Sequence, residues 1–486
     1  MRKHKYVSLT SVLAVLTAGF ALVGLGLFSA AFFYRLSIKD EGRFDLINLH
    51  ANLFNVFMVI TIFAMIFFLL VLLLRQIQKM RHPDTILVTL EYVDENGNKI
   101  KEMRAIEVPK TEEEIQKANK KKDSGDRFQK LILLDKQYPK KEYVESTEDL
   151  TLEYICRRFR SFASRIQGNP LYYSIDDIRR FVAALGVTKI MILQGMSGTG
   201  KTSLPVAWGK FTRVPTTVVP VQPMWKERSD LIGYFNEFTG KFNESMILEK
   251  LYEANKTNRI YLIVLDEMNI ARVEYYFAEF LSLLELPTVD ERILEVTSSI
   301  SKKDPKELHN GKLILPDNVY FVGTANNDDS TFAISDKVYD RSMVMNLDYR
   351  CDPFIGEDDY DPITISDDTL KALFAKAQKE YALTKRGRSH IREFDKYLSE
   401  IFQVTFGNRI RRQIEKYVPI YIACGGTEEE ALDDILAKKV LRKLESQNPI
   451  YIKAKADDLI NKMAEIFGKD RTPVCEAVIR KLANNS

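Results

Sequence analysis

The sequence predicts an α/β core built on a parallel sheet, followed by a helical lid and preceded by a two-helix transmembrane hairpin. Three observations predict this. Two long N-terminal runs lack Asp, Glu, Lys and Arg; the apolar strand Lys189 to Leu193 enters a glycine-rich loop; and the apolar strand Ile260 to Leu265 ends in two carboxylates. Apolar strands that alternate with helical segments favour a parallel sheet with helices on its faces.

The length of 486 residues by itself suggests about three domains. The net charge of +3 is small, so nothing global indicates nucleic-acid binding. Four cysteines (Cys156, Cys351, Cys424, Cys475) are widely spaced, which disfavours a zinc site or disulfide framework and fits a reducing cytoplasm. The predicted divisions are a membrane hairpin at 1–80, a β-hairpin and linker region at 81–146, the α/β core at 147–350 and the helical lid at 351–486.

Two transmembrane helices are predicted at about 7–34 and 46–74, because each run exceeds the roughly 20 residues that cross a bilayer. A signal peptide is the alternative for the first run, which is long for an h-region. Lys and Arg flank both helices on every side, so the positive-inside rule discriminates little. A hairpin leaves both termini on one side. We therefore expect a multi-pass protein of the cytoplasmic membrane with its large C-terminal part in the cytoplasm, where nucleotide is available.

The segment after the membrane helices carries the pattern of a β-hairpin. Residues 85–92 and 101–108 alternate apolar and polar side chains, and Asn96-Gly97 between them supplies positive φ angles for a turn. The following run, 117–127, is dense in charge. Its cluster Lys120-Lys121-Lys122 could touch anionic lipid or nucleic acid, but the interleaved acidic residues favour a solvated surface.

Residues 195–202 read G-x-x-x-x-G-K-T between a buried strand and a helix, the setting of a phosphate-binding loop. Glycines let the backbone N–H groups point at phosphate oxygens, and the helix N-terminus adds its dipole. Lys201 can reach the β- and γ-phosphates, while the Thr202 hydroxyl can hold Mg²⁺. The predicted nucleotide-binding residues are Gly195, Ser197, Gly198, Thr199, Gly200, Lys201, Thr202 and Ser203.

Asp266 and Glu267 follow the second apolar strand at the spacing expected after such a loop. Asp266 is predicted to hold the Mg²⁺ shell together with Thr202, and Glu267 to polarise the attacking water. A third strand, Val319 to Thr324, is expected beside the strand of the phosphate-binding loop, and Asn326 at its tip suits the orientation of that water.

Two arginines complete the predicted catalytic set. Arg341 precedes a short apolar strand, Met343 to Leu347, where it could reach a phosphate across a subunit interface. Arg409 lies in a run of arginines that opens a helix after Phe406. Taken singly, either arginine could be an ordinary surface charge.

From about Phe181 to the C-terminus the chain resembles an AAA+ ATPase, within the McrB-like group of the MoxR/dynein-related branch. The runs that carry the resemblance are L-Q-G-M-S-G-T-G-K-T-S-L-P (193–205), V-Q-P-M-W-K-E-R-S-D-L-I-G-Y-F-N (221–236), L-D-E-M-N-I-A-R-V-E-Y-Y-F-A-E-F-L-S-L-L-E (265–285) and G-T-A-N-N-D-D-S-T-F (323–332). The membrane runs and residues 82–146 lie outside it.

The resemblance implies that 195–202 is the Walker A motif and that Asp266 and Glu267 form Walker B. The group has M-N-x-x-D at its sensor 1 strand; here Asn326 and Asp329 match, and Ala325 replaces the Met. Arg341 then stands at the arginine-finger position and Arg409 at sensor 2, although Arg411 and Arg412 are close enough to leave that last assignment open. Residues 288–315 are expected to hold the hairpin that this branch inserts before sensor 1.

The implied assembly is a homo-oligomeric ring, expected to be a hexamer, in which Arg341 acts on the nucleotide of the neighbouring subunit. The implied cofactors are ATP or GTP with Mg²⁺. ATP is favoured because the chain has no N-K-x-D guanine motif, although this family does not recognise guanine in that way.

Three functions remain open at this stage. The first is the membrane-anchored motor of a McrBC-like restriction or phage-defence system, with a separate McrC-like nuclease as partner and DNA reached through that partner. The second is a MoxR-like chaperone that remodels membrane or envelope proteins, which the predicted anchor favours. The third, a nucleotide-gated scaffold without catalysis, is disfavoured because the whole catalytic set is present.

Overall fold

The computed structural model describes residues 85–93, 99–107, 126–144, 150–214, 216–326, 331–349 and 351–484, with backbone alone for the first two ranges. The chain divides into two compact units, 1–121 and 122–486. In the first, β1 (Thr85–Val93) and β2 (Lys99–Glu107) pair antiparallel with Val93 opposite Lys99, which confirms the predicted hairpin strands. The predicted membrane spans 7–34 and 46–74 lie outside the described residues, and no described helix is both long and apolar enough to cross a bilayer.

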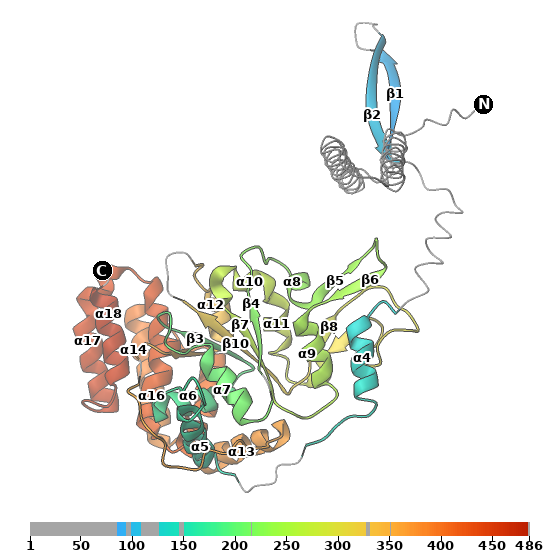
Figure 1. Cartoon of the computed structure of the whole chain (residues 1–486). Helices are drawn as coiled ribbons and strands as arrows, with labels where there is room; N and C mark the ends of the chain where they lie inside the picture. The colour runs from blue at the N-terminus through green and yellow to red at the C-terminus, as the bar shows by residue number, and fades with distance from the viewer. Residues whose placement is uncertain are drawn as a thin grey trace, which may run out of the picture. The chain divides into compact units, whose positions relative to one another are not determined.

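The second unit is built on a five-stranded sheet in the order β11-β3-β10-β7-β4, and every neighbouring pair is parallel (Figure 1). The strands are β3 (Ile190–Gln194), β4 (Thr217–Pro220), β7 (Tyr261–Asp266), β10 (Val319–Ala325) and β11 (Met343–Asn346). The predicted parallel sheet is thereby confirmed. β10 inserts between β3 and β7, as expected for a strand beside the phosphate-binding loop.

Alternate side chains of these strands enter two different cores, because successive residues of a strand point to opposite faces. On one face Met191, Leu193, Leu262 and Val264 join the core that contains the lid helices. On the other face Ile192, together with the strand side chains that point to the same side as Ile192, joins a second core. Both faces are therefore covered, which explains why these strands are almost wholly apolar in sequence.

Helices α5 (Leu152–Ser164), α6 (Ile175–Leu185) and α7 (Ser203–Phe211) cover the first face. α5 and α6 begin where the Thr151 and Ser174 side chains accept hydrogen bonds from backbone N–H groups, as helix caps do. The second face carries α8 (Arg228–Ile232), α9 (Met246–Ala254), α10 (Val273–Tyr276), α11 (Ala278–Leu283) and α12 (Asp336–Arg341).

Two antiparallel hairpins extend this unit. β5 (Gly233–Asn236) pairs with β6 (Lys241–Glu244), and β8 (Ile293–Glu295) pairs with β9 (Lys312–Ile314). The second confirms the hairpin expected within 288–315. Helix α4 (Gln129–Gln137) packs on α9 through Leu131, so residues assigned by sequence to the linker region belong with the α/β unit.

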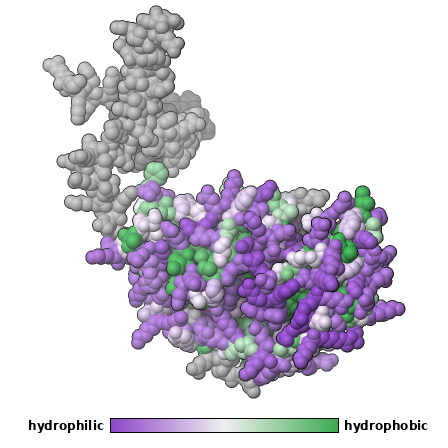
Figure 2. Space-filling view, turned by 180° about the vertical axis from the view of Figure 1, so that it is seen from behind, coloured by the Kyte–Doolittle hydropathy of each residue, from purple (hydrophilic) through white to green (hydrophobic). Residues whose placement is uncertain are grey.

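The C-terminal part is helical and gathers beside the sheet, in orange and red in Figure 1. It contains α13 (Asp367–Glu380), α14 (Lys385–Phe402), α15 (Asn408–Ala423), α16 (Glu428–Ile435), a π-helical turn (Leu436–Val440), a 3₁₀ segment (Leu441–Ser446), α17 (Pro449–Phe467) and α18 (Pro473–Asn484). Its apolar faces continue the first core, so lid and sheet share one packed interior. All four cysteines are free thiols. The face drawn in Figure 2 is mainly hydrophilic, with scattered hydrophobic side chains.

Candidate nucleotide site

The phosphate-binding loop lies at the carboxyl end of β3 and leads directly into α7. Gly195, Gly198 and Gly200 have φ angles of 142°, 77° and 92°, values that L side chains rarely adopt, which explains the glycines there. A Cβ on Gly195 would also stand 2.3 Å from the Leu347 carbonyl oxygen. Glycine at position 195 is therefore favoured by the lack of space for a side chain as well as by the backbone conformation.

The Lys201 side chain is buried and stays on the loop, where its amino group donates to the Gly195 and Met196 carbonyl oxygens at 2.9 and 2.6 Å. Tyr173, just before α6, donates its hydroxyl to the Gly200 carbonyl oxygen at 3.0 Å. Burial raises the pKa of the Tyr173 hydroxyl, so it remains a donor. The motif itself could not reveal this support for the loop, because Tyr173 precedes the loop by a whole helix and strand.

The Asp266 carboxylate, at the end of β7, is hydrogen-bonded to residues of two other parts of the sheet edge. Its Oδ1 accepts hydrogen bonds from the hydroxyls of Thr202, at 2.7 Å, and Thr324, at 2.9 Å. Thr202 comes from the loop after β3 and Thr324 from β10, so the predicted Walker A and Walker B residues are in direct contact. The carboxylate and hydroxyl oxygens suit Mg²⁺, a hard cation that keeps waters and phosphate oxygens as further ligands.

No group of three or more His, Cys, Asp or Glu in the described part of the chain could hold a metal. A nucleotide-bound Mg²⁺ does not need one, because one or two protein oxygens suffice when substrate phosphates complete the shell. Thr202 and Asp266 therefore fit the predicted role on the chemistry of their oxygens.

Glu267 adopts a left-handed backbone conformation, with φ 52° and ψ 49°. Such a conformation costs a non-glycine residue on the order of 1–3 kcal/mol and persists where surrounding contacts hold it. Here the Glu267 N–H donates to the Thr324 hydroxyl oxygen at 2.9 Å, and its carbonyl accepts from the Ile270 N–H at 3.0 Å. The side chain itself is exposed, at the edge of the sheet where Asp266 lies.

Asn326 follows β10 at the same edge, and its Oδ1 is buried without a hydrogen-bond partner. A buried unpaired acceptor is costly and suits a donor brought by water or substrate. Its backbone carbonyl accepts from the Asn269 amide at 2.9 Å and the Thr331 hydroxyl at 3.2 Å. Asn269 thus ties the segment after Glu267 to the end of β10. Asp329, matched by resemblance, lies outside the described residues.

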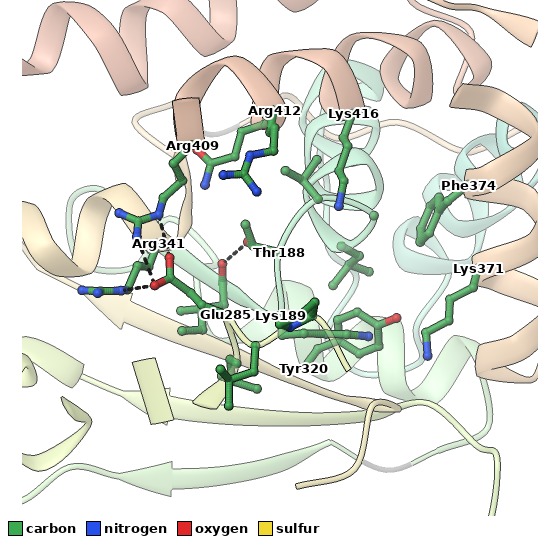
Figure 3. A pocket seen from close by; sticks show the side chains of 18 of the residues that line it. Thr188, Lys189, Glu285, Tyr320, Arg341, Lys371, Phe374, Arg409, Arg412 and Lys416 are labelled. Carbon is green, nitrogen blue, oxygen red and sulfur yellow. Dashed lines mark hydrogen bonds and ion pairs between the residues drawn. The ribbon is translucent and has the colours of Figure 1, made fainter. Parts of the chain in front are cut away.

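The two predicted catalytic arginines lie at the opposite end of the sheet. Arg341 immediately precedes β11 and lines a pocket with Lys189 and Tyr320, which belong to the amino ends of β3 and β10 (Figure 3). The strands are parallel, so a strand length of roughly 15 Å separates this end from the phosphate-binding loop. Arg341 therefore lies away from the phosphate-binding loop of its own chain.

Arg409 shares the position of Arg341 instead of lying at the loop. Glu285, after α11, accepts from the Arg341 Nε at 2.7 Å and from the Arg409 Nε at 2.6 Å. The neighbouring candidate Arg411 pairs with Asp395, and Arg412 lines the pocket. Sequence reasoning missed Glu285 and Thr324, since each acts through contacts far apart in the chain.

The bridging role of Thr324 leads to a testable expectation. Thr324→Val keeps the side-chain shape but removes the hydroxyl, which leaves the Glu267 N–H unpaired at a cost of about 1–3 kcal/mol. We expect nucleotide turnover to fall at least about tenfold, equivalent to 1.4 kcal/mol, with nucleotide affinity little changed, and Thr324→Ser to restore it. Phosphate release and nucleotide titration measure the two effects. Wild-type turnover in Thr324→Val would refute the role.

Comparison with known proteins gives a limited match. A family model described as a domain of unknown function, DUF8727, matches residues 364–486, the helical part from just before α13. No curated protein matches the chain in sequence. Among solved structures, a crystal structure of a candidate ATPase from Cytophaga hutchinsonii is similar, with a TM-score of 0.41 and 13% identity over 72% of this chain and 98% of that chain.

Proposed function

We propose that this chain is an AAA+ nucleoside triphosphatase that hydrolyses ATP with Mg²⁺ at 195–202, Asp266 and Glu267. The observation that carries the proposal is the Asp266 carboxylate, which accepts from both the Thr202 and Thr324 hydroxyls. The contacts bring the glycine-rich loop after β3, the carboxylates after β7 and the end of β10 to one edge of a parallel sheet, which supports the proposal.

The roles of the residues follow from their positions. Loop N–H groups and Lys201 would hold the phosphate chain, and Thr202 with Asp266 would hold Mg²⁺, whose charge would offset that of the phosphates. Glu267 takes a proton from the attacking water, and Asn326 orients that water through its side-chain amide. The groups proposed for phosphate binding and water activation thus follow three neighbouring strands of one subunit, β3, β10 and β7.

The proposed assembly is a homo-oligomeric ring, expected to be a hexamer. The separation of Arg341 from the phosphate-binding loop supports this, because Arg341 cannot serve its own nucleotide without a large rearrangement. In a ring, one subunit's Arg341 would stabilise charge that develops on its neighbour's γ-phosphate.

The proposal is tested by phosphate release from ATP and from GTP, measured side by side with and without Mg²⁺. Turnover of ATP that requires Mg²⁺ and disappears in Lys201→Ala is the expected result. Preference for GTP would revise the substrate but keep the reaction. Absence of hydrolysis with either nucleotide, in a folded and assembled protein, would refute the proposal.

The finer assignment rests on the sequence resemblance and the two apolar runs. We propose a motor of a McrBC-like defence system, anchored in the cytoplasmic membrane, with a McrC-like nuclease that brings DNA. Purification from the membrane fraction together with a nuclease is the expected outcome. Co-purification only with envelope proteins would instead support the remodelling chaperone.

A further inference from the structure

A cation-rich pocket of about 710 Å³ lies at the amino end of the sheet, away from the phosphate-binding loop. Its volume is in the range of small-molecule sites. One wall is the lid helix α15, another is α13, and the floor includes apolar side chains of α6 and α11. Seven of its lining residues are basic and only Glu285 is acidic; the basic ones are Lys189, Arg292, Arg341, Lys371, Arg409, Arg412 and Lys416.

Some of this positive charge is neutralised by nearby carboxylates. Asp317 pairs with Arg292 at 2.6 Å, with Lys189 at 3.6 Å and with Lys371. Asp367 also pairs with Lys371, at 2.5 Å. Burial lowers the pKa of Lys189 to about 8, against the opposing effect of the Asp367 and Asp317 carboxylates. On this side of the pocket two carboxylates thus offset most of the charge of three basic side chains, which serve in structural ion pairs.

The other side keeps an excess of positive charge. Glu285 alone faces Arg341 and Arg409, and neither Arg412 nor Lys416 forms an ion pair in the described part of the chain. Figure 3 shows Arg412 and Lys416 on one helix above the cavity, with Arg341 and Arg409 beside them. Four like charges around a concave surface concentrate positive potential, which favours an anion there.

Gln413 adds an independent observation at the same wall. It is only 6% exposed, lines the pocket, and its Oε1 has no hydrogen-bond partner. Its Nε2 donates to the Asp340 carbonyl oxygen at 3.0 Å, which fixes the orientation of the amide. The unpaired acceptor therefore suits a hydrogen-bond donor, such as a hydroxyl, carried by the ligand.

We propose that this pocket is a second anion site that binds the phosphate chain of a nucleotide through Arg409, Arg412 and Lys416. The Glu285 carboxylate competes for the same arginines and moves aside when phosphate binds. Exposed ion pairs contribute only about 0–1 kcal/mol, whereas bidentate Arg–phosphate contacts are stronger, so this exchange is energetically accessible.

The phosphate could come from free nucleotide or from nucleotide held on an adjoining subunit's loop. Binding of nucleotide that is held by an adjoining subunit rests on the proposed function. Binding of free nucleotide does not depend on hydrolysis. Both present the same chemistry to α15. Arg412 and Lys416 lie in this pocket and not in the phosphate-binding loop, so substituting them tests the pocket alone.

The test uses calorimetric titration of the full-length protein with ATP or tripolyphosphate, without Mg²⁺. A Lys201→Ala background removes hydrolysis and disables the loop. For free nucleotide, dilute single chains of this background should bind both probes, and Arg412→Gln/Lys416→Gln should weaken binding at least about tenfold. Since phosphate contacts release counterions, binding should also weaken as salt rises. Lys453→Gln/Lys469→Gln, two exposed lysines outside the pocket lining, is the matched control.

A second arm identifies the source. Single chains of the Lys201→Ala background will bind neither probe if the phosphate comes from an adjoining subunit. In that case Arg412→Gln/Lys416→Gln, introduced into otherwise wild-type protein, should weaken ATP binding in assembled samples and not in dilute ones. The proposal is overturned if the double substitution leaves binding unchanged in both arms. The two proposals can fail separately. If the Lys201→Ala chain binds the probes through Arg412 and Lys416 but the wild type hydrolyses no nucleotide, the anion site is supported and the proposed function is refuted.

Discussion

Glu267→Gln is expected to reduce nucleotide hydrolysis by about 10²- to 10⁴-fold while nucleotide binding persists, because glutamine has nearly the same shape but cannot accept the proton of the attacking water. Glu267 stands next to Asp266 in a left-handed backbone conformation held by the Thr324 hydroxyl. Glutamine can keep that conformation, so the change removes the proposed base and leaves the loop intact. Bound nucleotide should remain as triphosphate, which chromatography of the extracted nucleotide will show.

The matched control is Glu380→Gln at the exposed end of α13, which carries no assigned role. It should hydrolyse nucleotide like the wild type. Turnover in Glu267→Gln equal to that of the control would exclude Glu267 as the base and shift attention to another group at this edge of the sheet.

Arg341→Ala is expected to lower turnover by about 10³- to 10⁵-fold, the effect typical of an arginine that stabilises charge on the transferred phosphoryl group. Binding to the subunit's own loop should change little, because Arg341 lies at the amino end of the sheet with Glu285 and not at 195–202. Nucleotide titration of the variant at concentrations below assembly separates the two quantities.

Loss of affinity at the phosphate-binding loop itself, measured in dilute Arg341→Ala that also carries Arg412→Gln/Lys416→Gln to disable the pocket, would place Arg341 at its own nucleotide and contradict the geometry. Thermal unfolding of Arg341→Ala checks that the variant is folded. The unfolding temperature should change little, since Arg341 is partly exposed in an ion pair that contributes about 0–1 kcal/mol.

The sequence predicted the sheet and its loop-bearing edge well, because the determinants there are local. A continuous apolar strand, a glycine-rich turn and a carboxylate pair are each specified within a few residues. The position of β10 beside β3 also followed from the pattern and is confirmed by their pairing.

Features that depend on distant side chains were not predictable in this way. Glu285 joins Arg341 and Arg409, which are 56 and 124 positions away in the chain. Thr324 resembles any buried strand threonine until its hydroxyl is seen between Asp266 and Glu267. The membrane spans and the ring are still predictions, since the first lies outside the described residues and the second needs more than one chain.

The central claim is that each nucleotide site is completed by a neighbouring subunit, and mixing two inactive variants tests it most directly. Lys201→Ala cannot use its own loop but keeps Arg341, whereas Arg341→Ala keeps its loop. Each variant alone should hydrolyse almost no ATP. Mixed at equal concentration, they should recover a substantial fraction of wild-type turnover, because Arg341 of one subunit can complete the loop of the next. A mixture as inactive as its parts, despite co-assembly shown by mass measurement, would contradict the account.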